Sequence, residues 1–162
     1  MTKMVSFDTS STISGYAYWE NGALKQSGIL YHKDEKDTVI RVEDMAIDII
    51  NILKSCKPDI VVIEQPVLCN SAKTCIMLAE IVGCAKGYAI TSGADYVEYS
   101  ASEWRRLVAD DDERIPKNRD IAKQWDIDKV REIFQKEVED DNEADAILIG
   151  LARINQFKKG DV

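Results

Sequence analysis

Histidine is almost absent from this chain, and its cysteines lack the spacing of the common metal motifs. No pair among the four cysteines, Cys56, Cys69, Cys75 and Cys84, has the C-x-x-C spacing of a zinc site, so we expect core thiols in a reducing compartment. A Ser-His-Asp or Cys-His mechanism would depend on His32 alone, in a polar stretch that we expect to be a solvated loop. Histidine-based catalysis is therefore disfavoured.

Long apolar runs and an excess of positive charge are also missing. No apolar run approaches the roughly 20 residues that a membrane helix needs. We expect no signal peptide, because Lys3 is followed directly by a strand-like run. The net charge of −8 and the pI of about 4.7 give no global attraction to nucleic acid or to an anionic membrane. These features predict a cytoplasmic protein without a membrane partner, whose contacts with any polyanion depend on a local basic patch.

The 162 residues are enough for a domain with a substantial core, and 45% of them are hydrophobic. No internal repeat and no linker is visible, so residues 1–162 are expected to form a single domain. Periodicity of two, or a short apolar run, predicts strands. These cover residues 4–8, 15–20, 23–31, 60–64 and 96–99. Asn21-Gly22 is a strong two-residue hairpin turn between the second and third strands.

Apolar residues at helical spacing predict five helices. They cover residues 38–56, 71–90, a short helix through 104–108 capped by Ser100 or Ser102, 117–136 with a break near Trp125, and 142–157. The order predicts an antiparallel meander of three strands, joined through helical crossovers by two parallel strands. This α/β arrangement, a five-stranded mixed sheet flanked by helices, resembles the ribonuclease H-like fold.

Asp8 ends the first strand, and the small hydroxyl residues Thr9, Ser10 and Ser11 follow it. Ligands gather at the carboxyl ends of strands in open sheets, so Asp8 is a candidate metal or phosphate ligand. The alternative is a purely local role, in which Asp8 starts an Asx-turn that Ser10 or Ser11 caps.

Glu64 ends the strand over residues 60–64. A helical crossover makes parallel pairing of this strand with the first one the expected arrangement, which would place Asp8 and Glu64 at the same edge. Two carboxylates there would repel each other, and one would stay protonated unless a cation lay between them. Hard divalent ions such as Mg²⁺ prefer such oxygen ligands.

The start of the last helix supplies a third acidic group. Asn142 and Asp145 are three residues apart, and Asp141 and Asp145 are four apart, so either pair can share a helix face. Small Ala144 and Ala146 would let this helix end lie close to the sheet. The alternative is a capping cluster, with Asn142 as the N-cap. The combination with Asp8 and Glu64 favours a metal site.

Three segments resemble the motifs of RuvC-type Holliday junction resolvases. They are FDTSSTISGY at residues 7–16, VVIEQP at 61–66 and EADAILIG at 143–150. By position, the resemblance implies that Asp8, Glu64 and Asp145 are catalytic, metal-binding carboxylates. The family usually has a fourth acid where this chain has Asn142. Asn142 could ligate through its carbonyl oxygen, or Asp141 or Glu143 could take that role. The low pI resembles a phage variant of the family.

The resemblance implies Mg²⁺-dependent endonucleolytic cleavage of four-way DNA junctions, with Mn²⁺ as a possible substitute. Two ions per site would activate water and stabilise the leaving 3′ oxygen, and the products would carry 5′ phosphates. Paired nicks need two active sites, which implies a homodimer. Its expected interface is the helix over 71–90. Small residues there allow close approach, and apolar area comes from Ile76, Leu78, Ile81 and Val82.

Candidate DNA contacts are local cations and one apolar side chain. The cations are Lys73, Arg105, Arg106, Lys117, Arg119 and Lys123, and the resemblance places Arg105 and Lys117 where the family has basic contacts. Leu68 lies in a loop that, in relatives, wedges an apolar side chain into the junction. Each cation could instead be a solvated surface charge, and Leu68 could instead pack in the dimer.

Three other interpretations remain open. The chain could be a less selective endonuclease for branched or flap DNA, or a junction-binding relative that lost catalysis with the change to Asn142. A sugar-kinase or actin-like ATPase is the least favoured, because that architecture needs a longer chain and a second phosphate loop.

Overall fold

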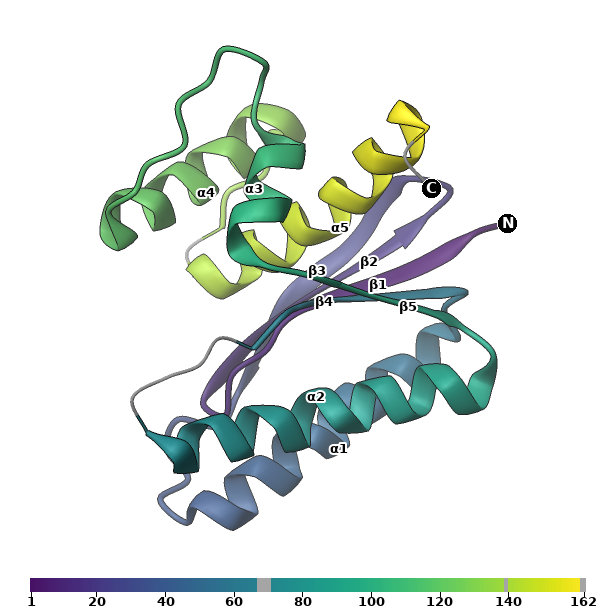
Figure 1. Cartoon of the computed structure of the whole chain (residues 1–162). Helices are drawn as coiled ribbons and strands as arrows, with labels where there is room; N and C mark the ends of the chain where they lie inside the picture. The colour runs from purple at the N-terminus through teal and green to yellow at the C-terminus, as the bar shows by residue number, and fades with distance from the viewer. Residues whose placement is uncertain (67–70, 139, 161–162) are drawn as a thin grey trace.

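A mixed sheet forms the centre of the computed structural model, which describes residues 1–66, 71–138 and 140–160 (Figure 1). Its strands are β1 (Lys3–Asp8), β2 (Ile13–Glu20), β3 (Ala23–Tyr31), β4 (Ile60–Glu64) and β5 (Asp95–Tyr99). They lie in the order β3-β2-β1-β4-β5. The first three pair antiparallel, whereas β4 pairs parallel with β1 and β5. The ribonuclease H-like arrangement predicted from the sequence is confirmed.

Helices cover both faces of the sheet. They are α1 (Thr38–Cys56), α2 (Ala72–Ser92), α3 (Ala101–Val108), α4 (Arg119–Phe134) and α5 (Asp141–Lys159). Figure 1 shows α1 and α2 on one face and α3, α4 and α5 on the other. Successive side chains of a strand point to opposite faces. Accordingly, Val5 and Phe7 belong to the core beneath α1 and α2, whereas Met4 belongs to the core beneath α5.

The hairpin between β2 and β3 follows the predicted turn chemistry. Asn21 has a φ of 51° and Gly22 a φ of 77°. Positive φ at both central residues is typical of the two-residue turn that matches the twist of its strands, and Asn-Gly is the pair that tolerates it best.

Helix α5 lies unusually close to β1 and β2. A Cβ on Gly15 would lie 1.7 Å from the backbone oxygen of Asn142, and one on Gly150 would lie 2.3 Å from Trp19 Nε1. Ser6 Oγ donates to the backbone oxygen of Ala146 at 2.7 Å. Ala144 and Ala146 are fully buried, as the sequence predicted. Small residues on both sides therefore bring the start of α5 against the end of β1.

Several helix boundaries differ from the predictions by one or two residues, and two features of the helices were predicted wrongly. Helix α4 runs unbroken through Trp125, whose indole Nε1 donates to Glu113 Oε1 at 2.8 Å. The N-cap of α5 is Asp140, not Asn142. The Asp140 carboxylate accepts both from the backbone nitrogen of Asn142 at 2.9 Å and from its Nδ2 at 2.7 Å. Asn142 therefore lies within the first helical turn.

The predictions for the isolated cysteines and the histidine need correction. Cys84 is exposed and Cys75 is half-buried, whereas half-buried Cys56 packs against the core beneath α1; Cys69 lies outside the described residues. His32 is half-buried rather than free in a loop, since its Nε2 lies 2.9 Å from Asp48 Oδ2 on α1. The histidine thus ties the end of the meander to the first helix.

Helix α2 is more apolar than the sequence analysis predicted for any segment of the chain. Among the described residues it is the one helix long and apolar enough to cross a membrane, with a mean hydropathy of 1.3. Core helices of soluble proteins pass the same test. One face of α2 is buried in this fold, through Ile81, Val82, Ala85 and Ala89.

Candidate metal centre

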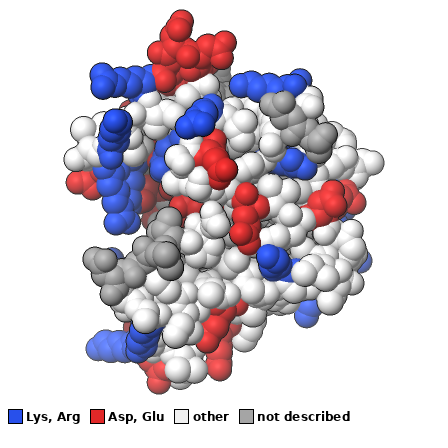
Figure 2. Space-filling model, viewed as in Figure 1, with Lys and Arg blue, Asp and Glu red and all other residues white. Residues whose placement is uncertain are grey.

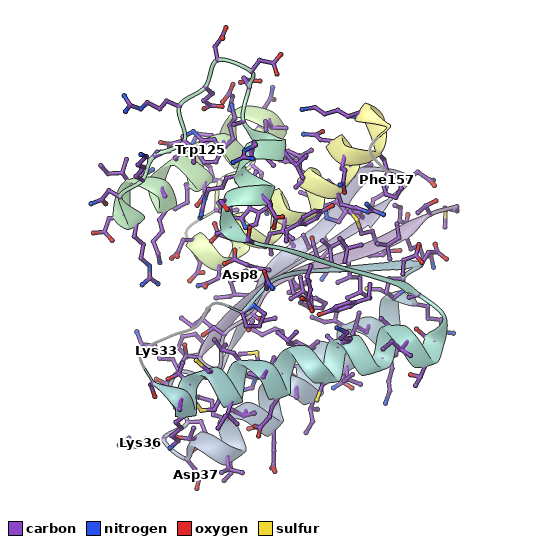
Figure 3. All side chains as sticks on the ribbon, viewed as in Figure 1. Asp8, Lys33, Lys36, Asp37, Trp125 and Phe157 are labelled. Atoms are coloured by element: carbon purple, nitrogen blue, oxygen red, sulfur yellow. The ribbon has the colours of Figure 1, made fainter. Side chains whose placement is uncertain are left out.

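Three carboxylates from separate elements line one pocket of about 500 Å³. Asp8 ends β1, Glu64 ends β4 and Asp145 lies in the first turns of α5. The parallel register pairs Phe7 with Ile63, so Asp8 and Glu64 follow at the same edge of the sheet. Both belong to the face that α5 covers, because they alternate with residues of the opposite core. Figure 3 shows Asp8 at the middle of the molecule, between α3 and α2.

Burial and mutual repulsion make these acids hard to ionise in the protein alone. Burial, followed by the charge of Glu64, raises the pKa of Asp8 to about 8. Burial, followed by the charges of Asp126 and Asp8, raises the pKa of Asp145 well above its usual range. Burial also raises the pKa of Glu64, although its hydrogen bond from Trp104 acts in the opposite direction. Such a cluster favours binding of a cation that neutralises it.

Helix α3 fixes the Glu64 carboxylate. Trp104 is fully buried and donates its Nε1 hydrogen to Glu64 Oε2 at 2.7 Å. Its ring also lies 4.2 Å from the guanidinium carbon of Arg105. The helix starts at a capping box in which Ser100 and Glu103 satisfy each other's backbone nitrogens, as the predicted Ser100 cap requires.

Arg105 lies between two acids. Its Nε bonds Asp126 Oδ1 at 3.0 Å and its Nη2 bonds Asp126 Oδ2 at 2.7 Å, whereas Nη2 is 3.8 Å from Asp145 Oδ2. Burial opposes the charge of Arg105, but the ion pair with Asp126 outweighs it and raises the pKa of the guanidinium. Neither Asp126 nor Trp104 was identified from the sequence. The available signal was that Asp126 lies four residues after buried Ala122 and four before buried Val130, on the inner face of α4.

Only some of the polar side chains at the start of α5 line the pocket. Asp141 and Asn142 line the pocket, and Asp141 Oδ2 forms an ion pair with Lys123 Nζ. The Asn142 amide nitrogen donates to Asp140, which leaves the side-chain oxygen as its group for a metal. Glu143 instead accepts from Ser27 Oγ at 2.7 Å and lies 3.3 Å from Lys136 Nζ. It does not line the pocket with the other acids.

The predicted DNA contacts fall into three places. Arg105, Lys117, Arg119 and Lys123 line the carboxylate pocket. Arg106 is exposed and is not among the lining residues, and Lys73 lines a separate groove between α1 and α2. Leu68 lies outside the described residues. In Figure 2, Lys and Arg side chains gather along the left edge of the upper half, over the N-terminal part of α4.

The donor set fits a divalent cation, although the side chains are not arranged in a ready-made metal geometry. Within residues 1–66, 71–138 and 140–160, no group of three His, Cys, Asp or Glu side chains is close enough to hold an ion as placed. Asp145 Oδ1, however, is buried and has no hydrogen-bond partner among those same residues. A buried carboxylate oxygen without a partner is costly unless a cation binds it. Oxygen donors of this kind suit Mg²⁺ or Mn²⁺.

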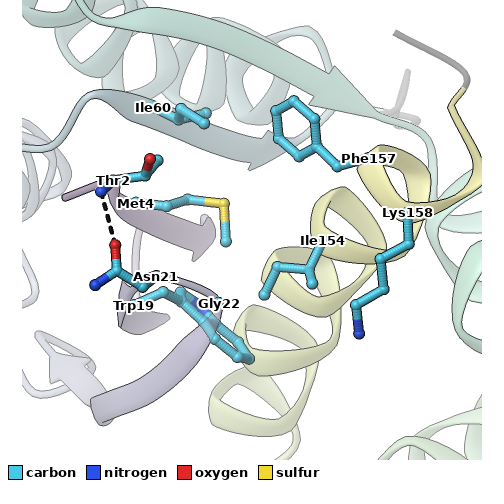
Figure 4. Close-up of a pocket in the computed structure, with 9 residues that line it drawn as sticks. All are labelled: Thr2, Met4, Trp19, Asn21, Gly22, Ile60, Ile154, Phe157 and Lys158. Carbon is cyan, nitrogen blue, oxygen red and sulfur yellow. Dashed lines mark hydrogen bonds between the residues drawn. The ribbon is translucent and has the colours of Figure 1, made fainter.

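A second cavity, of about 310 Å³, lies at the opposite end of the sheet (Figure 4). Met4 and Ile60, near the starts of β1 and β4, contribute to its lining together with Ile154 and Phe157 of α5. Among the described residues that line it there is no carboxylate. This cavity therefore offers no carboxylate to a metal ion, unlike the pocket at the carboxyl ends of the strands.

Comparison with solved structures shows the same fold at low sequence identity. RuvC from T. thermophilus, in complex with a Holliday junction substrate, superimposes with a TM-score of 0.78 at 15% identity, covering 99% of this chain and 97% of that one. The yeast mitochondrial Holliday junction resolvase Ydc2 gives a TM-score of 0.62 at 11% identity, covering 98% and 82%. No curated protein matches the chain.

A family model described as Lactococcus phage M3 protein (DUF3882) matches residues 1–153. That span includes every strand of the sheet and each of the pocket carboxylates. The chain therefore belongs to this phage protein family, and its fold is that of the RuvC-type resolvases.

Proposed function

We propose that the protein is a metal-dependent endodeoxyribonuclease that resolves four-way DNA junctions. The observation that carries this proposal is the convergence of Asp8, Glu64 and Asp145 in one cation-rimmed pocket, on the fold of a protein whose structure holds a Holliday junction. The fold alone would not establish an activity. The acids that the fold brings together supply the chemical argument.

Asp8, Glu64 and Asp145 would hold the metal, and the side-chain oxygen of Asn142 is the proposed fourth donor. Asp141 is less suited to that role, because its carboxylate already pairs with Lys123. When bound, a pair of Mg²⁺ ions would supply an activated water and neutralise charge at the leaving 3′ oxygen, giving 5′-phosphate products. Trp104 keeps the Glu64 carboxylate oriented, and Arg105 adds a fixed positive charge beside the cluster.

DNA would approach along the basic side of the pocket. Lys117, Arg119 and Lys123 come from the loop before α4 and from its first turns, so one structural unit presents all three. Phosphate contacts of this kind position a duplex without reading its sequence. The net charge of −8 makes such a local patch the region where a polyanion is attracted.

Two coordinated nicks would require two copies of the chain, related by a two-fold axis. The outward face of α2 is the proposed interface. It exposes Ile76 at 59% and Ile90 at 68%, and a Cβ built on Gly83 or Gly87 would meet nothing within 4 Å. A helix with exposed apolar side chains and glycines can approach its copy closely. A dimer of this kind, acting on phage or bacterial DNA, would work in the cytoplasm.

The decisive experiment incubates the protein with a labelled synthetic four-way junction, with and without Mg²⁺. We expect paired nicks with the wild type and none with Asp8→Asn, which should still bind the junction because the basic rim of the pocket is unchanged. Asp112→Asn, in an exposed loop, makes the same chemical change away from the pocket and should cleave normally. A fully active Asp8→Asn variant would contradict the metal-centre assignment.

The same assay separates the two alternatives. Equal rates on three-way, fork and four-way substrates would indicate a general branched-DNA endonuclease. Junction binding without cleavage in either Mg²⁺ or Mn²⁺ would indicate a binding protein. The presence of Asn142 at the pocket, in place of the family's fourth acid, is the observation that favours this last outcome.

A further inference from the structure

Asp126 is a fully buried carboxylate that does not line the pocket. Both of its oxygens bond the Arg105 guanidinium, at 3.0 Å and 2.7 Å. A buried ion pair of this kind contributes little net stability, because desolvation of the two charges offsets their attraction. Its place directly behind the metal-binding acids points to a role in the site.

We propose that Asp126 is a positioning residue that holds the Arg105 guanidinium back from Asp145, so that Asp145 keeps an oxygen for a divalent cation. The inference rests on the proposed metal centre. The geometry carries it: Arg105 Nη2 is 2.7 Å from Asp126 Oδ2 but 3.8 Å from Asp145 Oδ2, and Asp145 Oδ1 has no partner among the described residues.

Competition between the two acids for one guanidinium explains why this restraint matters. A guanidinium forms its strongest pair with a single carboxylate through two parallel hydrogen bonds. If Asp126 lost its charge, Arg105 would be left as a largely buried cation, and Asp145 is the nearest remaining carboxylate in an ion pair with it. A fork on Asp145 would occupy both of its oxygens and place a fixed positive charge beside the metal position.

The rest of α3 limits where Arg105 can go. Its guanidinium already stacks on Trp104, whose indole holds Glu64. Because Arg105 Nη2 is already 3.8 Å from Asp145 Oδ2, the guanidinium needs to move only a little to bond Asp145. Asp126 lies close enough for its own charge to act on Asp145, and it also acts on that acid by holding the Arg105 guanidinium away from it.

The test measures Mn²⁺ binding to the full chain by the electron paramagnetic resonance signal of free Mn²⁺. Asp126→Asn should weaken binding by about tenfold or more, as expected for redirecting a close charge pair. Adding Arg105→Gln to that variant removes the competing cation and should restore binding to within about threefold of wild type. A merely structural role for Asp126 predicts no such rescue.

Glu137→Gln is the matched control. It removes one acid from an Arg–carboxylate fork at the end of the same helix, where Arg131 bonds both oxygens of Glu137 in an exposed position. Mn²⁺ affinity should not change. The melting temperature of each variant, followed by circular dichroism, reports whether it is folded.

Wild-type Mn²⁺ affinity in Asp126→Asn, or a double variant as weak as the single one, would overturn the proposal. Should Asp126→Asn fail to fold, Arg105→Lys replaces it. That variant keeps the charge without the fork and should bind Mn²⁺ more weakly, so unchanged affinity would again overturn the proposal. A wild type that binds no Mn²⁺ would remove the metal centre and this inference with it. A wild type that binds Mn²⁺ and shows the rescue, but cuts no junction, would refute only the proposed function.

Discussion

Two tryptophans each donate an indole hydrogen to a glutamate. Trp104 Nε1 bonds Glu64 Oε2 at 2.7 Å in the pocket, and Trp125 Nε1 bonds Glu113 Oε1 at 2.8 Å, outside the lining of the pocket. The bonds are chemically alike, but only the first orients a proposed metal ligand. Groups that orient a ligand commonly matter almost as much as the ligand itself. Substituting each tryptophan in turn therefore separates an effect on the proposed metal site from an effect on protein stability.

Trp104→Phe should reduce Mg²⁺-dependent cleavage by about 10- to 100-fold, the usual cost of losing a group that orients a metal ligand. The indole bond lowers the pKa of Glu64 against burial, so its loss also leaves that acid more protonated. The measurement is the single-turnover rate as a function of Mg²⁺ concentration. Trp125→Phe should lower the free energy of unfolding and leave the rate unchanged. Equal losses in both variants would contradict the role of Trp104.

The raised pKa of Asp8 predicts that metal-free protein becomes less stable as pH rises. The folded state holds the proton up to about pH 8, whereas the unfolded chain releases it near the ordinary value of about 3.9. The stabilisation is therefore complete at acid pH and declines between these two values. Melting temperatures recorded in chelator from pH 5 to 9 should fall for the wild type. The fall should be smaller for Asp8→Asn, which cannot ionise, and added Mg²⁺ should stabilise only the wild type at high pH.

At the scale of elements, the contact between α5 and the sheet decides whether the site forms. Asp8 pairs with Gly15 across β1 and β2, and the first turn of α5 lies directly over Gly15. The absence of a side chain at this one strand position lets Asn142 reach the edge where Asp8 ends. Trp19 and Ser6 make the corresponding contact farther along the helix, at Gly150.

Gly15→Ala should disrupt both the fold and the site. Its Cβ would lie 1.7 Å from the Asn142 backbone oxygen, so the start of α5 must move away from the sheet. We expect a loss of about 1–3 kcal/mol or more in the free energy of unfolding together with weaker Mn²⁺ binding. Urea denaturation and Mn²⁺ titration measure the two effects. Gly83→Ala, where a Cβ meets nothing within 4 Å, should instead leave Mn²⁺ binding intact and stabilise α2 by about 0.5–1 kcal/mol.

At the scale of the whole molecule, the two helical layers differ in character. The layer of α3, α4 and α5 carries the basic rim of the pocket and the ion pairs beside it. The layer of α1 and α2 leaves large apolar side chains in solvent, at Val39, Ile47, Ile76 and Ile90. The other layer also exposes apolar side chains, at Ile121 and Phe157, so the case for an interface rests on the glycines and isoleucines of α2 together. We propose that one side of the sheet binds DNA and metal and that the other side contacts a second copy of the chain.

Gly87→Arg should weaken self-association while leaving the fold intact. The new side chain would project into open space on α2 and place a charge within the proposed interface. Sedimentation velocity should show a larger monomer fraction than in the wild type, and junction cleavage should change from paired to single nicks. Ser55→Arg introduces the same charge on α1, in the groove toward β3, and should not alter association. A Gly87→Arg variant that associates like the wild type would exclude this face of α2.

Much of the architecture was predictable because it depends on short-range patterns. The parallel pairing expected from a helical crossover placed Asp8 and Glu64 at one edge of the sheet, and the Asn21-Gly22 turn identified the hairpin. The start of α5 was harder: from the sequence, Asn142 was named as the cap, and only the hydrogen bonds show that Asp140 caps the helix. The predicted break of α4 near Trp125 was wrong, since tryptophan lowers helix propensity only slightly and the helix runs through it. That residues 1–162 form one domain stays a prediction.

The sequence by itself determined the strands and most of each helix, since backbone conformation and periodicity depend on a few neighbouring residues. It also identified the acids at the ends of β1 and β4 and at the start of α5. Only the tertiary structure decided which groups surround those acids. Arg105 and Asp126 are 21 residues apart on different helices, and no spacing rule relates them. Likewise, Gly15 and Asn142 are in contact only because α5 folds back over β2. Burial, which raises the pKa values of the acids and leaves one Asp145 oxygen unpartnered among the described residues, is a property of this assembled packing.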